Sequence, residues 1–128
     1  MFNHVMVGSN DIGRSKVFYD ALFGAMGGKP GAQDPGGRLI YVHNGAVFLV
    51  GQPIDGKPAS HANGGTIGFK MASAEQADAW HKAGVANGGT AIEDPPGVRQ
   101  TGGGPMYLAY LRDPDGNKLC AAYRMAAA

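Results

Sequence analysis

The stretch "RDPDGNKLCAAY", Arg112 to Tyr123, decides the C-terminal half of the fold. Its Asp115-Gly116 pair is typical of a tight turn, and apolar residues rich in strand formers flank the turn on both sides. The pattern therefore predicts a β-hairpin. Pairing across this turn places Tyr110, and Leu108 two residues earlier, on the same face as Cys120, because alternate residues of a strand point to the same side.

The N-terminal half has a hairpin of the same kind. "RLIYVHNGAVFLVGQP", residues 38–53, consists of two apolar runs joined by Asn44-Gly45, a pair suited to the positive φ angles of a type I′ turn. Before it, "NHVMVG" at residues 3–8 predicts a short strand. "DIGRSKVFYDALFG" at residues 11–24 has apolar residues at helical spacing and predicts a helix.

The same order of elements then starts again. "GTIGFKM", residues 65–71, predicts a strand, and Ser73 followed by Gln76 forms a capping box that opens a helix over residues 74–88. A short strand at 90–94 and the C-terminal hairpin complete the second set. From position 4 to position 66 the repeat has a period of about 62 residues. We expect one domain over residues 1–128, with module one at about 1–56 and module two at about 62–126.

The strands are apolar on both faces, which limits the architectures available to them. Val5 and Val7 alternate with Met6, and Tyr41 lies between Ile40 and Val42. A sheet with one solvated face would alternate apolar and polar residues, so both faces must be covered. The helices cover one face, and an inward-curving sheet around a small-molecule cavity would cover the other. The predicted fold class is therefore α+β with a cupped sheet.

Composition excludes several classes of function. Eleven basic residues oppose ten acidic ones, and the basic residues are scattered, so no nucleic-acid partner is expected. No apolar run approaches the roughly 18–20 residues needed to cross a bilayer, and no signal segment is visible at the N-terminus. The single cysteine cannot form an internal disulfide. We expect a cytoplasmic protein without a membrane partner.

Three segments resemble the vicinal oxygen chelate superfamily, which includes glyoxalase I, extradiol dioxygenases, and the fosfomycin- and bleomycin-resistance proteins. They are "HVMVGSNDIGRSKVFYDALFGAMGG" at 4–28, "PPGVRQTGGGPMYLAY" at 95–110 and "YLRDPDGNKL" at 110–119. The resemblance covers essentially the whole chain. It implies two βαβββ modules that form a cupped mixed sheet, a divalent metal inside the cup, and a homodimer.

The resemblance also implies where the metal ligands would lie. The family's ligand positions fall on His4, Leu49, Thr66 and Cys120, where histidine or glutamine, an acid, histidine and glutamate are usual. Only the first position keeps its usual residue. Leucine cannot bind a metal, threonine is a weak ligand, and cysteine binds well only as thiolate. We therefore expect no metal cofactor, with zinc, nickel or iron bound through an altered ligand set as the alternative.

Other histidines could complete such a set only if they reach inward. His43 borders the Asn-Gly turn at the rim of the sheet, whereas His61 and His81 are interpreted as solvated. Cys120 is interpreted as a small apolar residue in the place of a metal-binding glutamate. Its alternative role is that of a nucleophile activated by His4.

Strand alternation and the resemblance together predict the lining of the pocket. Lys70 shares a face with Thr66, and Arg99 lies in a glycine-rich segment, residues 95–105, that is predicted to be a mobile loop able to act as a lid. Surface positions are the alternative for both cations, and core packing is the alternative for Tyr110. The predicted ligand-binding residues are His4, Met6, Val47, Leu49, Thr66, Lys70, Arg99, Tyr110 and Cys120.

These residues favour a glyoxalase/bleomycin-resistance-like protein that binds, and in one version transforms, a small, partly apolar, anionic molecule. For a catalytic version, His4 would be the general base, with Tyr110 or Lys70 as the electrophilic partner. One alternative is a metal-dependent lyase or dioxygenase. Another is a non-catalytic dimeric scaffold. The sequence leaves open whether the protein is an enzyme.

Overall fold

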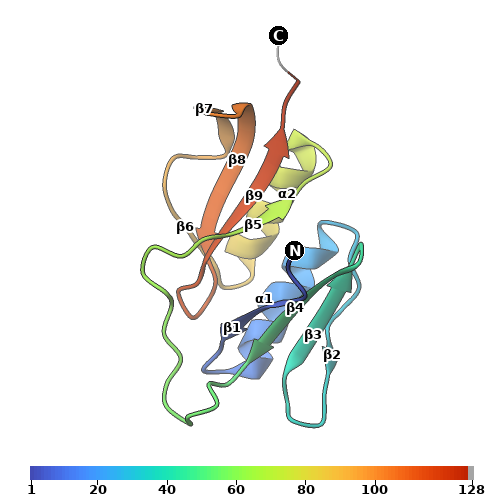
Figure 1. Cartoon of the computed structure of the whole chain (residues 1–128), viewed down its shortest axis with the longest axis vertical. Helices are drawn as coiled ribbons and strands as arrows, with labels where there is room; N and C mark the ends of the chain where they lie inside the picture. Colours follow the sequence, from blue (N-terminus) through green and yellow to red (C-terminus); the bar gives the residue numbers. More distant parts are fainter. Residues whose placement is uncertain (127–128) are drawn as a thin grey trace.

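A computed structural model describes residues 1–126, and the last two residues of the predicted domain lie outside this range. Module one contains β1 (Val5–Gly8), α1 (Ile12–Gly24), β2 (Ala32–Gln33), β3 (Leu39–His43) and β4 (Ala46–Gly51). Module two contains β5 (Ile67–Lys70), α2 (Ala74–Ala86), β6 (Thr90–Ala91), β7 (Gly97–Thr101), β8 (Gly104–Arg112) and β9 (Lys118–Arg124). Each module has its own mixed sheet (Figure 1).

The two sheets repeat one topology, as the sequence predicts. The first has the order β1-β4-β3-β2 and the second β5-β9-β8-β6, with β7 also paired to β8. In each module the first strand runs parallel to the last, and the last two strands form an antiparallel hairpin. The helices begin at Ile12 and Ala74 and end at Gly24 and Ala86, so the 62-residue offset holds at both ends. The prediction of an α+β fold with two βαβββ modules is confirmed.

Local signals account for where the elements start and turn. Asn44 and Gly45 have φ angles of 49° and 80°, as a type I′ turn requires. The side chain of Ser73 accepts a hydrogen bond from the Gln76 amide at 3.1 Å. Gln76 Oε1 in turn accepts from the amide of Ala72 at 2.7 Å, one residue before the expected partner. The first turn of α2 is therefore capped by reciprocal bonds.

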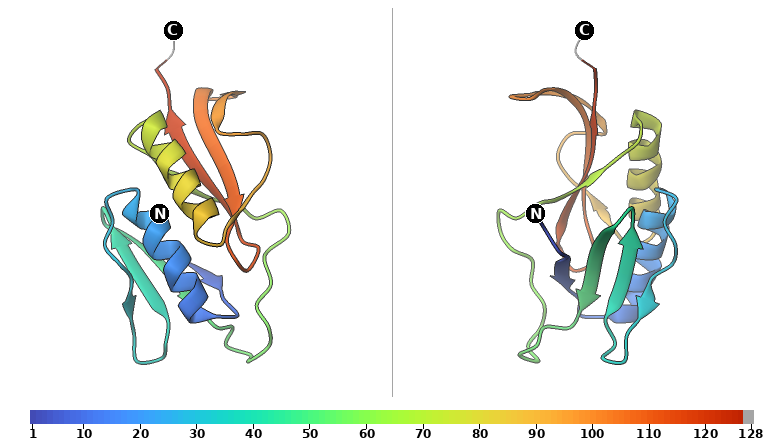
Figure 2. Two further views of the ribbon diagram at one scale, coloured as in Figure 1. Left: turned by 180° about the vertical axis from the view of Figure 1, so that it is seen from behind. Right: turned by 45° about the vertical axis from the view of Figure 1, so that its right-hand side comes forward.

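Both helices lie side by side on the same side of the two sheets (Figure 2). Gly84 allows this packing, since a Cβ atom at that position would lie 2.5 Å from a methyl carbon of Leu111 and 3.0 Å from one of Leu22. The core between helices and sheets is fully buried. Its largest side chains are Trp80, Tyr19, Phe18, Leu22, Leu39, Met71, Leu111, Leu119 and Val50.

The turn between β8 and β9 joins module two to module one. The buried Asp113, 4% exposed, accepts hydrogen bonds from the amides of Asp115 and Asn117, both at 2.9 Å. Its other carboxylate oxygen accepts from the Tyr19 hydroxyl of α1 at 2.5 Å. Burial, followed by the charge of Asp113, raises the pKa of Tyr19 well above its usual range, so this hydroxyl keeps its proton and donates.

Asp115 adds a second contact to the same helix. Its side chain is 1% exposed, and its Oδ1 atom accepts from the Asn10 amide at 2.9 Å and from Arg14 Nη2 at 2.8 Å. A carboxylate at the start of α1 also interacts favourably with the helix dipole. We call Asp113, Asp115, Asn10, Arg14 and Tyr19 the inter-module clasp. The Asp-Pro-Asp-Gly-Asn sequence thus fixes the position of one module on the other.

The prediction of a mobile loop over residues 95–105 is wrong for most of its length. Gly97–Thr101 forms β7, which pairs residue by residue with the first half of β8. Its glycines provide the turn at residues 102–103 and the positive φ of 103° at Gly104. A strand bonded along its length is held in place, so this segment lacks the freedom of a lid. The strand predicted at 90–94 is also shorter, at Thr90–Ala91.

Neither helix within residues 1–126 has the length and apolar character needed to cross a membrane.

Candidate functional site

A cavity of about 400 Å³ is lined by residues of both modules and by the first residues of the chain. It is bounded by the start of β1, the β3–β4 hairpin, the end of α1 and β5. We call it the inter-module cavity. Its lining residues are Phe2, Asn3, His4, Val5, Phe23, Met26, Gly28, Lys29, Tyr41, Val42, His43, Asn44, Ala46, Val47, Phe48, Ile67, Gly68, Phe69 and Lys70.

Three phenylalanine rings from both modules form the buried base of this cavity. The ring centroids of Phe23, Phe48 and Phe69 lie 5.3–5.5 Å apart, and each pair meets edge to face. Phe23 and Phe48 are almost fully buried, whereas Phe69 of β5 is half-buried. The accessible part of the base is therefore contributed mainly by module two, supported from beneath by module one.

The polar groups of the cavity are basic or neutral. Lys29, Lys70, His4 and His43 line it, and none of its lining residues is acidic. Within residues 1–126 neither lysine forms an ion pair with a carboxylate. A mostly apolar concavity with a few basic groups is typical of a site for a small organic anion. Long-range attraction would also favour an anion there.

His4 has one ring nitrogen engaged and one available. Its Nδ1 lies 2.8 Å from Asn3 Oδ1, so the neutral ring donates at Nδ1 and keeps an unprotonated Nε2. An imidazole in this tautomer can accept a proton or a hydrogen bond from a bound molecule. The predicted role of His4 as a general base stays a prediction.

Asp20 holds the loop that carries Lys29. Its Oδ1 accepts from the Gly31 amide at 2.9 Å and from the Tyr41 hydroxyl at 2.7 Å, while Oδ2 accepts from Lys16 at 2.6 Å. Burial alone would raise the pKa of Asp20, but these hydrogen bonds outweigh burial and lower it. A Cβ atom at Gly31 would lie 2.5 Å from the Tyr41 ring, so only glycine allows so close an approach.

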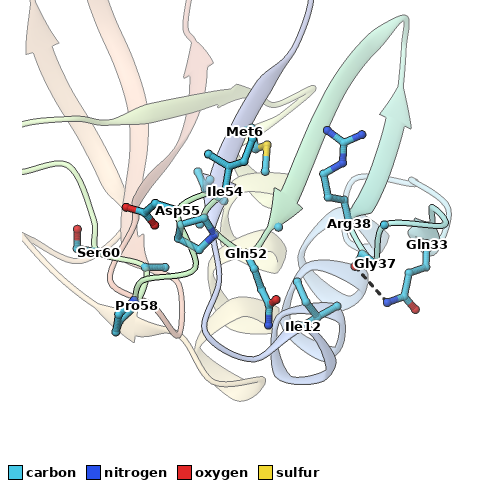
Figure 3. A pocket seen from close by; sticks show the side chains of 16 residues that line it. Met6, Ile12, Gln33, Gly37, Arg38, Gln52, Ile54, Asp55, Pro58 and Ser60 are labelled. Carbon is cyan, nitrogen blue, oxygen red and sulfur yellow. Dashed lines mark hydrogen bonds between the residues drawn. The ribbon is translucent and has the colours of Figure 1, made fainter.

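The structure distributes the predicted site residues over three places. His4, Val47 and Lys70 line the inter-module cavity together. Leu49 and Thr66 line neither that cavity nor the groove that contains Met6. This groove, of about 1030 Å³, runs between β1, the β2–β3 turn and the linker 52–60. Figure 3 shows Met6 beside Ile54, which is fully exposed at 106%, with Gln33 bonded to Gly37 at the far end.

Tyr110 and Cys120 are opposite each other in the β8–β9 register and do not line the inter-module cavity, but they lie beside it, because Cys120 is the ladder partner of the cavity-lining Gly68. Cys120 is 6% exposed, and its thiol donates to the Ala121 carbonyl at 3.4 Å. Burial raises the pKa of this thiol, so it is protonated at neutral pH. Burial likewise raises the pKa of Tyr110. Both groups are therefore uncharged, and Lys118 lies 5.0 Å from the Tyr110 ring centroid.

The guanidinium of Arg99 is occupied by contacts within the chain. Its Nη1 donates to the carbonyls of Pro95, Gly97 and Leu108 at 2.9–3.0 Å, and its Nη2 donates to that of Asp94 at 2.8 Å. It lies 5.9 Å from the Tyr110 ring centroid. Arg99 thus fastens the segment before β7 to β8. Arg99 could bind a ligand, as predicted, only if some of these hydrogen bonds to carbonyl groups were replaced by hydrogen bonds to the ligand.

The donor set does not fit a divalent metal. Within residues 1–126 no three histidine, cysteine or acidic side chains gather closely enough to hold one. Leu49 and Cys120 occupy matching positions, opposite Met6 and Gly68 in the parallel pairs of the two modules. The leucine side chain cannot coordinate a metal, and the thiol of Cys120 carries its proton. We therefore derive no chemistry from a metal.

His81 corrects one expectation. It was expected to be solvated, but its ring is half-buried and Nε2 lies 3.0 Å from the Tyr110 carbonyl oxygen. The interaction ties α2 to β8 on the side of the sheet covered by the helix. His81 is therefore a structural residue and is not among the residues that line the inter-module cavity.

Comparison with known proteins decides the family. The family model for the glyoxalase/bleomycin resistance protein/dioxygenase superfamily matches residues 1–121. The chain belongs to this superfamily. Among solved structures, a glyoxalase/bleomycin resistance protein from Albidiferax ferrireducens T118 is 55% identical and has a TM-score of 0.94, over 97% of this chain and 99% of that one. No curated protein matches the chain.

More distant superfamily structures share the fold alone. A glyoxalase-related enzyme from Fulvimarina pelagi is 20% identical with a TM-score of 0.71, over 94% of this chain and 86% of that one. A lactoylglutathione lyase from Agrobacterium tumefaciens is 19% identical with a TM-score of 0.65, over 96% and 92%. Superfamily membership therefore explains the architecture, while the choice of ligand depends on the side chains of this chain.

Sequence reasoning missed several of the cavity-lining residues. Lys29 follows two glycines in a segment read only as a connection, and Phe23 and Phe48 have the pattern of ordinary core residues. No strand is predicted around Lys29, so strand alternation could not assign its side chain to a face of the sheet.

Proposed function

We propose that the protein binds a small, partly apolar, anionic molecule in the inter-module cavity and that it does so without a metal ion. The observation that supports this most directly is the lining itself, which combines a base of three phenylalanine rings with Lys29, Lys70, His4 and His43 and contains no carboxylate. Apolar burial would supply most of the affinity, at roughly 25 cal/mol per Å². The basic groups would supply selectivity for an anion.

His4 is the residue best placed to act on the bound molecule. Its free Nε2 could accept a proton, and Lys70 lines the same cavity as a cation. Tyr110, the other predicted catalytic residue, is not among the residues that line the cavity and lies opposite Cys120 in the β8–β9 register. We therefore propose binding as the function and assign any proton transfer to His4 rather than to Tyr110.

A comparison of acids with their amides tests the binding proposal. Isothermal titration with small carboxylates and the matching neutral amides should detect binding of the acids alone. Lys70→Met should weaken this binding at least about tenfold, because it removes a charge from the lining. Lys82→Met is the matched control, since Lys82 is exposed on α2 and lines none of the cavities. Equal binding of acids and amides would contradict the proposal.

Elemental analysis of protein purified without chelator tests the metal-free part. We expect metal well below one equivalent per chain. A stoichiometric transition metal that is lost in His4→Ala would instead support a metal-dependent lyase or dioxygenase with an altered ligand set.

We further propose that the protein is a cytoplasmic homodimer. Exposed aliphatic residues on the face of module one opposite α1, including Met6 and Val42, support association, and the single reduced Cys120 supports a reducing compartment. Light scattering of the purified protein should give twice the chain mass. A dimer that binds no small acid at all would favour the scaffold alternative.

A further inference from the structure

We propose that the ligand is an aliphatic carboxylate whose acid group lies between Lys70 and Arg124 and whose chain passes over Gly68 into the inter-module cavity. This inference rests on the proposed function, names its ligand class and adds Arg124 as a binding residue. Three features support it: a second cavity that shares a wall with the first, two cations without a carboxylate partner, and aliphatic side chains on the same side of module one.

A second cavity, of about 490 Å³, shares part of its lining with the inter-module cavity. Gly68 and Lys70 of β5 line both cavities, and Arg124 of β9 lines the second, which we call the β9 cavity. A Cβ atom built on Gly68 would meet nothing within 4 Å, so the space over this residue is open. A molecule bound in one cavity can therefore extend over Gly68 into the other.

The strand register places the side chains of Lys70 and Arg124 on one face of the module-two sheet. Lys70 is the ladder partner of Ala122, which precedes Arg124 by two residues on β9. Partners in a ladder share a face, and so do alternate residues of a strand. Phe69 projects from the opposite face, where its ring centroid lies 6.2 Å from that of Trp80 on α2. The two cations therefore lie on the face that the helices leave uncovered.

Lys70 and Arg124 are placed to hold one acid group between them. They are diagonal neighbours on adjacent strands, a separation of about 7–8 Å that long side chains can bridge. Within residues 1–126 neither forms an ion pair, and no described residue lining the β9 cavity is acidic. Arg124 Nη1 donates to the carbonyl of Gly103 at 2.8 Å, which orients the guanidinium without neutralising its charge. A carboxylate between the two would gain charge-assisted hydrogen bonds from both.

Module one contributes aliphatic side chains to the same side of the inter-module cavity. Val42 and Val47 line this cavity and are directly opposite each other in the β3–β4 ladder. Phe48, the neighbour of Val47, projects from the other face of the sheet and packs against Phe23 of α1. Val42 is 60% exposed, so an alkyl chain laid against it would remove apolar surface from water. The uncovered face thus offers an aliphatic surface in module one and a cationic pair in module two.

Chain length separates this inference from the proposed function. Butyrate, octanoate and octanamide are each titrated into the protein, and binding is followed by amide chemical shifts in two-dimensional NMR spectra. We expect octanoate to bind at least about tenfold more tightly than butyrate, because its additional methylenes would be buried between the modules. We expect octanamide to bind at least about tenfold more weakly than octanoate.

The possible failures of these titrations differ in what they overturn. Equal affinities for butyrate and octanoate would overturn the aliphatic-carboxylate inference and leave the proposed function in place. Equal affinities for octanoate and octanamide, or binding of neither acid, would overturn both.

Two variants test the path of the chain and the place of the acid group. Gly68→Val puts a side chain into the open space shared by the two cavities and should lower the affinity for octanoate to that for butyrate. Arg124→Gln should weaken the binding of both acids about fivefold. Its matched control is Lys82→Gln, which also removes an exposed cation but changes neither cavity and should bind octanoate as the native protein does.

Thermal unfolding of each variant shows whether a loss of binding reflects a loss of structure. Arg124 is exposed, so Arg124→Gln should unfold at the native temperature and tests the acid site even if Gly68→Val lowers stability. An unchanged affinity for octanoate in a folded Gly68→Val, or in Arg124→Gln, would overturn the inference.

Discussion

Removing one hydroxyl group from the inter-module clasp should destabilise the whole protein. Tyr19→Phe deletes the hydrogen bond from the Tyr19 hydroxyl to Asp113, which is 2.5 Å long and fully enclosed. Hydrogen bonds to charged groups contribute about 1.5–3 kcal/mol. Asp113 keeps its bonds from the Asp115 and Asn117 amides, so the loss should lie near the middle of this range, at about 2 kcal/mol.

Urea unfolding at pH 7 and 25 °C would measure this loss as a lower midpoint with an unchanged slope. The matched control is Tyr123→Phe, which removes a hydroxyl from a half-buried tyrosine outside the clasp and should change the free energy of unfolding by less than about 0.5 kcal/mol. Asp113→Ala should cost more than Tyr19→Phe, about 4 kcal/mol, because it leaves several buried donors without an acceptor. A Tyr19→Phe variant as stable as Tyr123→Phe would refute the reasoning.

Three further predictions concern titratable groups. Burial raises the pKa of Tyr19, so the contribution of Tyr19 to the free energy of unfolding is complete below about pH 10 and should fall as the pH rises further. Urea unfolding at a series of pH values should show a shallower fall for Tyr19→Phe than for the native protein. Asp20→Ala should weaken the binding of a small carboxylate about threefold, because it frees the loop that carries Lys29. Asp20→Asn keeps an oxygen acceptor and should restore most of the affinity, and equal affinities in both variants would argue against a positioning role. The protonated, buried Cys120 should react with a disulfide reagent on the order of 100-fold more slowly than in urea, and a fast native reaction would contradict its burial.

Much of the architecture could be predicted because its signals are local. The Asn44-Gly45 and Asp115-Gly116 pairs mark both hairpins, and the helix starts carry their own capping residues. Apolar residues on both strand faces predict a sheet covered on both sides, but the helices cover only one face, and Met6 and Val42 on the other face are exposed. The repeated order of these elements was therefore visible without any tertiary information.

The composition of the site could be predicted only in part, because it depends on contacts between distant segments. Strand alternation correctly groups Tyr110 with Cys120, but it does not reveal that His4 lines the inter-module cavity and that this pair does not. The hydrogen bonds of Asp20 to Gly31 and Tyr41, and those of Arg99 to four backbone carbonyls, form only in the folded chain and have no signal in the local sequence. The glycine-rich composition of residues 95–105 led to the wrong prediction of a mobile loop, since β7 in this segment is a paired strand.

A crystal structure of the protein with 4-bromobenzoate, with anomalous data collected at the bromine edge, tests the central claim most directly. We expect one strong bromine peak inside the inter-module cavity, with the carboxylate within reach of Lys70. The absence of a bromine peak from that cavity, or an anomalous metal peak at His4 closed by other protein donors, would contradict a metal-free site for an organic anion between the modules.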